Sequence, residues 1–129
     1  MPAKPWVTFC QPDPEREYLV LLTALPLKHL RDLGAFLLYT WRILGQLRRT
    51  PGLLGYSLLA HILQRQFWTL SVWEDEAALQ QFVVSYPHSQ VMRALQDKMG
   101  QTHFVRWHMR GAAFPPHWQE ALTRQDAAQ

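Results

Sequence analysis

The sequence contains a single cysteine, Cys10, among 129 residues. This shortage excludes an intrachain disulfide and any zinc site that needs several cysteines. A chain of this length buries enough apolar surface to fold as one domain without such links. We therefore expect one domain that is stable without disulfides, in a reducing, cytoplasmic environment.

Long apolar runs are also missing. The longest, LGAFLLYTWRILG, is interrupted by Arg42 and is shorter than the about 20 residues that cross a bilayer. The N-terminal segment, MPAKPWVTFCQPDPERE, has scattered prolines and lacks the apolar core of a secretory signal. We expect a soluble protein that has no membrane partner.

Charge of either sign is not in large excess. Lys and Arg total 13 and Asp and Glu total 10, which gives a net charge of +3. The cations are scattered except at Arg48 and Arg49, which lie at the end of a predicted helix, where positive charge complements the helix dipole. No standard nucleic-acid-binding motif is present, so we expect no nucleic-acid partner.

What the sequence does contain is a regular alternation of strand and helix patterns. Branched and aromatic residues concentrate in four segments, which we predict as strands: 17–25, 55–63, 66–73 and 102–110. Apolar residues three or four apart predict helices over 27–49 and 74–99, the second interrupted by Pro87. A short helix is expected over 116–124. Residues 1–16 are expected to form a proline-rich arm, and residues 17–129 a single domain.

The first predicted helix carries apolar residues on more than one side. Phe36, Tyr39 and Ile43 widen a main stripe whose members recur every three or four positions. The stripe consists of Leu30, Leu33, Leu37, Trp41, Leu44 and Leu47. We expect other parts of the protein to cover this helix on more than one side.

The order β-α-β-β-α-β is typical of the α+β, ferredoxin-like fold, in which both helices cover one face of a four-stranded antiparallel sheet. Both faces of the predicted strand 66–73 carry large apolar side chains: Phe67 and Trp73 on one face, and Trp68, Leu70 and Val72 on the other. Helices on one side leave the second face exposed to water. We therefore expect a homodimer that forms through the sheet faces.

The run LRRTPGLLGYSLLAHILQRQFWTLSVWEDEAALQQFVVSYPHSQVM resembles the antibiotic-biosynthesis-monooxygenase group of the dimeric α/β-barrel superfamily. The similar features are the PGLLG start of the second strand, a third strand that ends in Trp73 before an acidic turn, and a histidine in the second part of the following helix. The likeness covers roughly residues 17–110. It implies a ferredoxin-like dimer with a small pocket between sheet and helices.

The resemblance also implies a chemistry without a cofactor. Cofactor-independent members oxidise electron-rich phenols, quinols or anthrones, which reduce oxygen themselves once they are deprotonated, while the protein supplies a dry pocket and hydrogen bonds to the anion. Carried over to this chain, Trp73 positions the ring of a small aromatic or polyketide-like substrate, His88 accepts the proton, and Arg93 or Thr69 stabilises the anion. Thr69 stands at the position of a family asparagine, and Leu79 stands where a tyrosine is expected.

Each of these residues also has a structural explanation. Trp73 fills a core in the simpler interpretation, His88 caps the helix that follows Pro87, and Arg93 faces solvent. The haem-degrading branch is less similar, because His88 reaches the position of its axial ligand only if Pro87 shifts the helical register. The alternative function is a noncatalytic dimeric module that binds an apolar ligand or haem. No pair of histidines has the spacing of a metal site, so we expect no structural metal.

Overall fold

The computed structural model describes residues 5–85 and 88–128, except for the side chains of His88, Ser89 and Ala128. Its sheet is antiparallel throughout, with the order β1-β3-β4-β2-β5. The strands are β1 (Val7–Thr8), β2 (Glu17–Pro26), β3 (Leu53–His61), β4 (Gln66–Trp73) and β5 (His103–Arg110). The helices are α1 (Leu33–Leu47), α2 (Glu76–Val84), α3 (His88–Leu95) and α4 (Trp118–Ala128), with short 3₁₀ turns η1 (Leu30–Asp32) and η2 (Gly111–Ala113).

The predicted α+β, ferredoxin-like fold is confirmed, with one additional strand in the sheet. β1 comes from the segment predicted as an arm, and Val7 pairs with Tyr56 on β3. Gly55 permits this close approach, since a Cβ atom at Gly55 would lie 2.6 Å from the carbonyl oxygen of Val7. The prediction of four strands missed β1 because two paired residues are too short to produce a periodic pattern.

Element boundaries differ from the prediction at β3, at α1 and at α4, which covers 118–128 and not 116–124. β3 covers 53–61 and not 55–63, because the residues after His61 form a turn in which the Arg65 amide donates to the Ile62 carbonyl at 3.0 Å. α1 begins at Leu33 and not at Leu27, because Leu27 forms a β-bridge with Met99. The same bridge explains why α3 ends at Leu95, before the predicted Met99.

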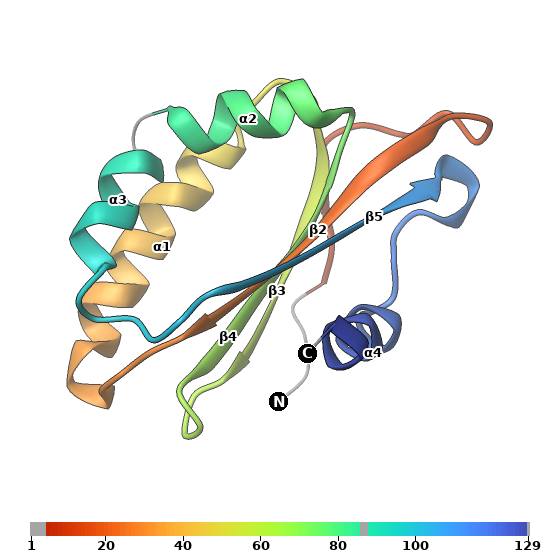
Figure 1. Ribbon diagram of the computed structural model, residues 1–129. Coiled ribbons are helices and arrows are strands. Elements are labelled where there is room, and N and C mark those ends of the chain that lie inside the picture. Colours follow the sequence, from red (N-terminus) through yellow and green to blue (C-terminus); the bar gives the residue numbers. More distant parts are fainter. Residues whose placement is uncertain (1–4, 86–87, 129) are drawn as a thin grey trace.

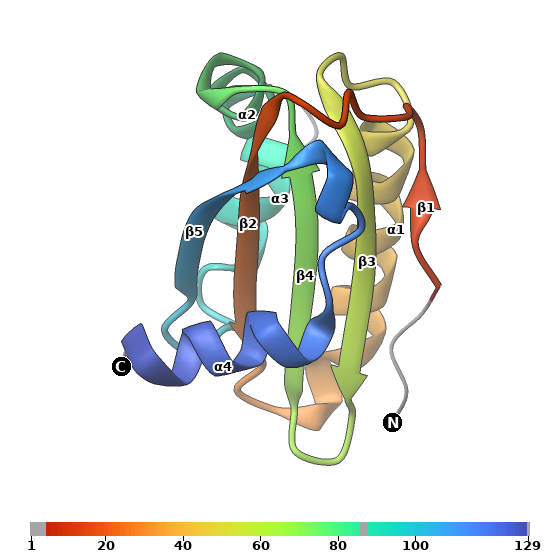
Figure 2. The ribbon, with the colours of Figure 1, turned by 90° about the vertical axis from the view of Figure 1, so that its right-hand side faces the viewer.

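The helices lie in two layers. α1, α2 and α3 cover one face of the sheet, and α4 lies against the opposite face (Figure 1). α4 crosses in front of the strands on the side away from α1 (Figure 2). Within the described residues, no helix is both long and apolar enough to cross a membrane.

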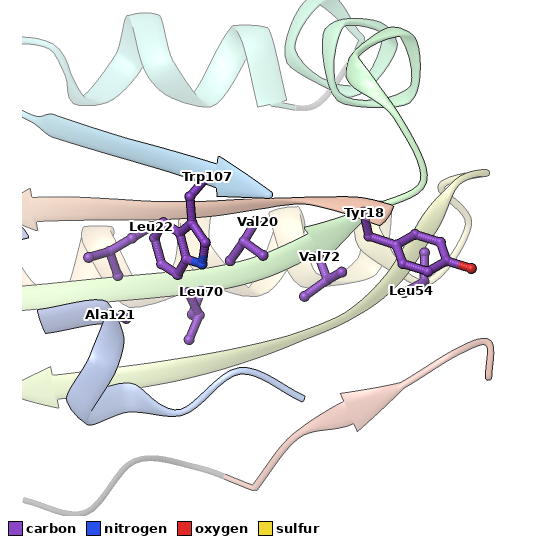
Figure 3. Packing of buried hydrophobic residues seen from close by; sticks show 8 residues of the cluster. All are labelled: Tyr18, Val20, Leu22, Leu54, Leu70, Val72, Trp107 and Ala121. Atoms are coloured by element: carbon purple, nitrogen blue, oxygen red, sulfur yellow. The ribbon is translucent and has the colours of Figure 1, made fainter. Parts of the chain in front are cut away.

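The face under α4 has its own apolar core, which β2, β3, β4, β5 and α4 share (Figure 3). Its buried members are Tyr18, Val20, Leu22, Leu54, Leu70, Val72, Trp107 and Ala121. Two hydrogen bonds fix α4 here: the Trp118 indole donates to Ser57 Oγ at 2.9 Å, and the Trp68 indole donates to Gln125 Oε1 at 3.0 Å. The chain thus covers part of the face for which the sequence predicted a second copy, and the sheet-face homodimer stays a prediction.

The face under α1, α2 and α3 contains two apolar clusters. The cluster at the α2 end, called the Trp73 cluster, consists of Leu19, Leu47, Leu53, Tyr56, Trp73, Leu79 and Phe82. The cluster at the α3 end, called the Phe36 cluster, consists of Leu27, Phe36, Phe67, Val91, Leu95 and Met99. The candidate site lies in this helix-covered layer.

The start of α2 follows from the acidic run after β4. The Asp75 side chain accepts a hydrogen bond from the Ala78 amide at 2.9 Å, and Glu76 adds negative charge to the first turn. Both features stabilise the N-terminal end of a helix. α2 then places Leu79 and Phe82 over Trp73.

Candidate ligand-binding site

A cavity of about 200 Å³ lies between α1, α3 and the sheet, next to the Phe36 cluster. We call it the α1–α3 cavity. Its lining residues are Leu25, Phe36, Thr40, Ile43, Met92, Leu95, Gln96, Met99, Gly100 and Thr102. All of them except Gln96 are buried or half-buried, so the helix layer encloses the cavity in part, and Gln96 lies at its rim.

The chemistry of this lining is mainly apolar. Among the described lining residues, the polar side chains are Thr40, Gln96 and Thr102, and none is acidic, basic or a histidine. The Thr40 hydroxyl donates to the Phe36 carbonyl at 2.8 Å, which leaves its oxygen able to accept a further hydrogen bond. The cavity therefore suits a small uncharged molecule that makes few hydrogen bonds.

Trp73 is a core residue in the structure. Its side chain is 1% exposed, its ring centroid lies 5.3 Å from that of Phe82, and its indole N–H donates to Ser71 Oγ at 2.8 Å. Ser71 Oγ in turn lies 3.5 Å from the Leu21 carbonyl oxygen, to which it donates. The indole is thus fully packed and hydrogen-bonded, and it does not line the α1–α3 cavity.

The other predicted site residues lie apart from one another. Thr69 is half-buried on the helix-covered side of β4, between Thr23 on β2 and Leu58 on β3. Arg93 is exposed on α3. Neither residue lines the α1–α3 cavity. His88 is the first residue of α3, and its side chain lies outside the described residues.

The sequence did not identify the residues that form the cavity. It predicted a main stripe on the first helix that includes Leu37 and Trp41, whereas the structure directs Phe36, Thr40 and Ile43 toward the cavity and exposes Leu37 and Trp41. Positions 36, 40 and 43 do share one helical face. Because apolar residues surround most of this helix, that signal does not say which face meets the sheet.

Two larger hollows lie on the surface and are lined by more exposed side chains than the α1–α3 cavity. One, of about 570 Å³, lies between β5, η2 and α4; the other, of about 600 Å³, lies between the end of α1 and α2. In the first, the Arg124 guanidinium lies 4.8 Å from the Trp107 ring centroid and 3.3 Å from the Glu120 carboxylate. Their exposure makes both hollows less suited than the α1–α3 cavity to exclude water from an apolar ligand.

Among the described residues, no group of three or more His, Cys, Asp or Glu side chains is placed to hold a metal ion. Cys10, the single thiol, is exposed in the N-terminal segment. The described part of the chain thus provides no metal centre next to the cavity.

Several solved structures with the same fold are named as oxygenases. A candidate monooxygenase from Lactobacillus acidophilus aligns with a TM-score of 0.64 at 12% identity, over 82% of this chain and 51% of the other. SnoaB, a cofactor-independent oxygenase from Streptomyces nogalater, aligns with a TM-score of 0.61 at 14% identity, over 77% of this chain and 98% of the other. A candidate antibiotic biosynthesis monooxygenase from Nitrosomonas europaea aligns with a TM-score of 0.63 at 15% identity, over 69% of this chain and 95% of the other.

These comparisons confirm the resemblance at the level of the fold. The chain spans about half the length of the Lactobacillus acidophilus protein, and identities this low establish a shared fold and not a shared activity. No curated protein matches the chain. Residues 45–128 match the family model described as a domain of unknown function, DUF3291, and the chain belongs to this family.

Proposed function

We propose that the α1–α3 cavity binds a small aromatic molecule and that the protein oxidises it as a cofactor-independent monooxygenase. The partly enclosed, mainly apolar cavity in the helix-covered layer carries this proposal. The fold supports it, because SnoaB, which shares the fold, is named as a cofactor-independent oxygenase. The cavity volume of about 200 Å³ is smaller than the roughly 300–1,000 Å³ that is typical of pockets for drug-sized ligands. We therefore propose a substrate of one or two rings.

The proposed reaction needs a substrate that reduces oxygen itself. A quinol or anthrone-like compound loses a proton, its carbanion or phenolate transfers electrons to O₂, one oxygen atom forms the new C=O group, and the other leaves as water. The protein then has to exclude water, hold the ring and stabilise the anion. Thr40, Thr102 and Gln96 are the lining residues that can hydrogen-bond to the substrate oxygen.

We propose His88 as the proton acceptor. An imidazole side chain can accept and release a proton near neutral pH. In the sequence it precedes the lining residue Met92 by one helical turn, and residues so spaced share a helical face. Trp73 and Thr69 lie on the sheet side of the same layer, and Arg93 lies on the surface of α3. We propose that these three residues stabilise the structure around the cavity and do not contact the substrate.

A noncatalytic binding module is the second candidate function. The described lining residues favour it, because they include no charged or histidine side chain and so provide neither an acid nor a base. Haem fits this cavity poorly, since the volume lies below that of drug-sized pockets. The ligand of such a module would be a small apolar molecule.

The first experiment measures the melting temperature against a panel of quinols, anthrones and haem. A ligand at about a hundred times its Kd stabilises the native state by roughly 2.7 kcal/mol, which raises Tm by several degrees. We expect phenolic compounds to raise Tm in the wild type and not in Gln96→Trp, which fills the rim of the cavity. Gln90→Trp, at an exposed position of α3 outside the lining, is the control.

Oxygen uptake then separates the two functions. The enzyme predicts uptake with the compounds that raise Tm, and His88→Ala should abolish uptake while it leaves the Tm shift intact. A protein that binds these compounds without uptake is a binding module. Equal uptake by His88→Ala and the wild type contradicts the role proposed for His88, and equal Tm shifts in Gln96→Trp and Gln90→Trp contradict the location of the site.

A further inference from the structure

The outer side of α1 exposes large apolar side chains to water. Trp41 is 69% exposed, Leu37 is 50% exposed and Leu38 is 48% exposed, and Leu30 in the preceding turn η1 is 43% exposed. Scattered single apolar residues are normal on a protein surface, but a contiguous group of this kind marks an interaction site. The sequence predicted that this helix is covered on more than one side, and α1 has this side still uncovered.

These residues form one continuous stripe. Gly34, Leu37, Leu38, Trp41 and Gly45 are spaced three or four residues apart, so they lie along the same side of the helix. A Cβ atom added at Gly34 or Gly45 would meet nothing within 4 Å. The stripe is therefore open along the length of α1, and we call it the α1 stripe.

Cations surround the α1 stripe. Between positions 28 and 49, the chain carries a single carboxylate, Asp32, and the exposed cations Lys28, Arg31, Arg42, Arg48 and Arg49. The ion pairs between described side chains use Arg16, Lys98, Arg106 and Arg124, none of which belongs to this set. The cations beside the stripe are thus available to an external anionic partner.

We propose that the α1 stripe docks on an anionic lipid surface. Exposed leucines and a tryptophan that are flanked by cations fit the boundary between lipid headgroups and acyl chains, where Trp is favoured and cations meet acidic headgroups. A second copy of the chain fits less well, because two such stripes would bring like charges together with only Asp32 to offset them. This proposal departs from the sequence-based expectation of no membrane partner, because the sequence did not show which side of α1 is exposed.

The same helix connects this surface to the cavity. Phe36, Thr40 and Ile43 on the inner side of α1 line the α1–α3 cavity, while Leu37 and Trp41 on the outer side form the stripe. A docked protein therefore holds its cavity next to the lipid. This suits a substrate or ligand that dissolves in the membrane, and this part of the inference rests on the proposed function, whereas the docking itself does not.

The test is cosedimentation with lipid vesicles in the absence of any substrate. We expect the protein to bind vesicles of phosphatidylcholine mixed with phosphatidylserine and to bind vesicles of phosphatidylcholine alone at least tenfold more weakly. Leu37→Ser with Trp41→Ser should reduce binding to the anionic vesicles by about tenfold or more, because it removes buried apolar area. Arg31→Gln with Arg42→Gln should reduce it by about fivefold per charge and weaken its salt dependence.

Phe104→Ser is the matched control, because Phe104 is 63% exposed on β5, outside α1. It should bind as the wild type does, and circular dichroism melting of every variant checks the fold. Equal binding to both vesicle types, no binding to either, or an equal loss in Phe104→Ser overturns the proposal. A dimer in sedimentation velocity that the Trp41 variant dissociates, without vesicle binding, also overturns it and assigns the stripe to a second copy.

Discussion

At its α2 end, the layer between the helices and the sheet is filled by Trp73, whereas at its α3 end it encloses a cavity of about 200 Å³. Both ends belong to the same sheet face and are covered by helices of similar length. The Trp73 cluster combines the rings of Trp73, Phe82 and Tyr56. The cavity instead has Thr40, Gly100 and Thr102 among its lining residues, and these small side chains leave volume unfilled.

The comparison shows that a prominent aromatic residue is a poor marker of a pocket. The sequence directed attention to Trp73 because it ends a strand and a helix follows at once. In the structure its indole has a hydrogen-bond partner and its ring is packed. The cavity formed where the side chains were too small to fill the space between α1, α3 and β2.

The largest effect is expected at the packed end. Trp73→Ala should lower the free energy of unfolding by about 3–5 kcal/mol, because it leaves a void in a filled core. Met92→Ala at the hollow end should cost less than half as much, since Met92 is half-buried beside an existing cavity. Urea denaturation of both variants measures the difference. Equal losses would mean that the two ends are packed alike.

A smaller effect is expected from the polar partner of Trp73. Ser71→Ala leaves the buried indole N–H without its acceptor and should cost about 1–3 kcal/mol. Thr40→Val at the hollow end removes a hydroxyl that donates to a helix carbonyl at the cavity wall, and it should change stability by less than about 0.5 kcal/mol. If Thr40→Val lowered the free energy of unfolding as much as Ser71→Ala does, the packed end and the hollow end would not differ in this respect. The measurement is again urea denaturation.

The N-terminal cap of α2 should contribute about 1 kcal/mol to the free energy of unfolding. Asp75→Ala removes the acceptor of the Ala78 amide and weakens the helix that covers Trp73. Asp75→Asn keeps an acceptor at the same place and should lose clearly less. The melting temperatures of both variants test this, and a cap that mattered only through its charge would make the two losses equal.

The smallest effect concerns pH. Burial raises the pKa of Tyr56 above its usual 10.0, and the nearby Arg48 acts in the opposite direction. A group whose folded pKa is raised contributes stability that is complete below its unfolded pKa and is lost as pH rises through the folded value. Stability should therefore fall above pH 10.0, and less steeply in Tyr56→Phe. Urea denaturation on both sides of that pH, in the wild type and the variant, measures the slopes, and identical slopes would exclude Tyr56 as a cause.

Much of the fold was predictable because it depends on local patterns. The strand 66–73 alternates in a two-residue period and β4 has these bounds. The acidic residues 74–76 marked the start of α2, and Asp75 does cap it. The order of these elements limits the topology to a few arrangements, and the structure has the predicted one. β1 and the end of β3 were missed because pairing and turn geometry, and not periodicity, define them.

The site was much less predictable. Its lining comes from β2, α1, α3 and the segment before β5, and residues so far apart in sequence produce no common pattern. Trp73 and Arg93 have recognisable positions in the sequence, but the structure places one in the core and the other in solvent. Pocket residues such as Thr40 and Gly100 are ordinary residue types, so only their assembly distinguishes them.

By itself, the sequence determined the class of fold, because hydrophobic periodicity and helix caps act within a few residues of one another. Only the tertiary structure decided which side of α1 faces the sheet, where the cavity lies, and that α4 covers the opposite face. These outcomes depend on how side chains from distant segments fill a shared volume. Close packing is a property of the whole assembly, and the order of residues along one element does not encode it locally.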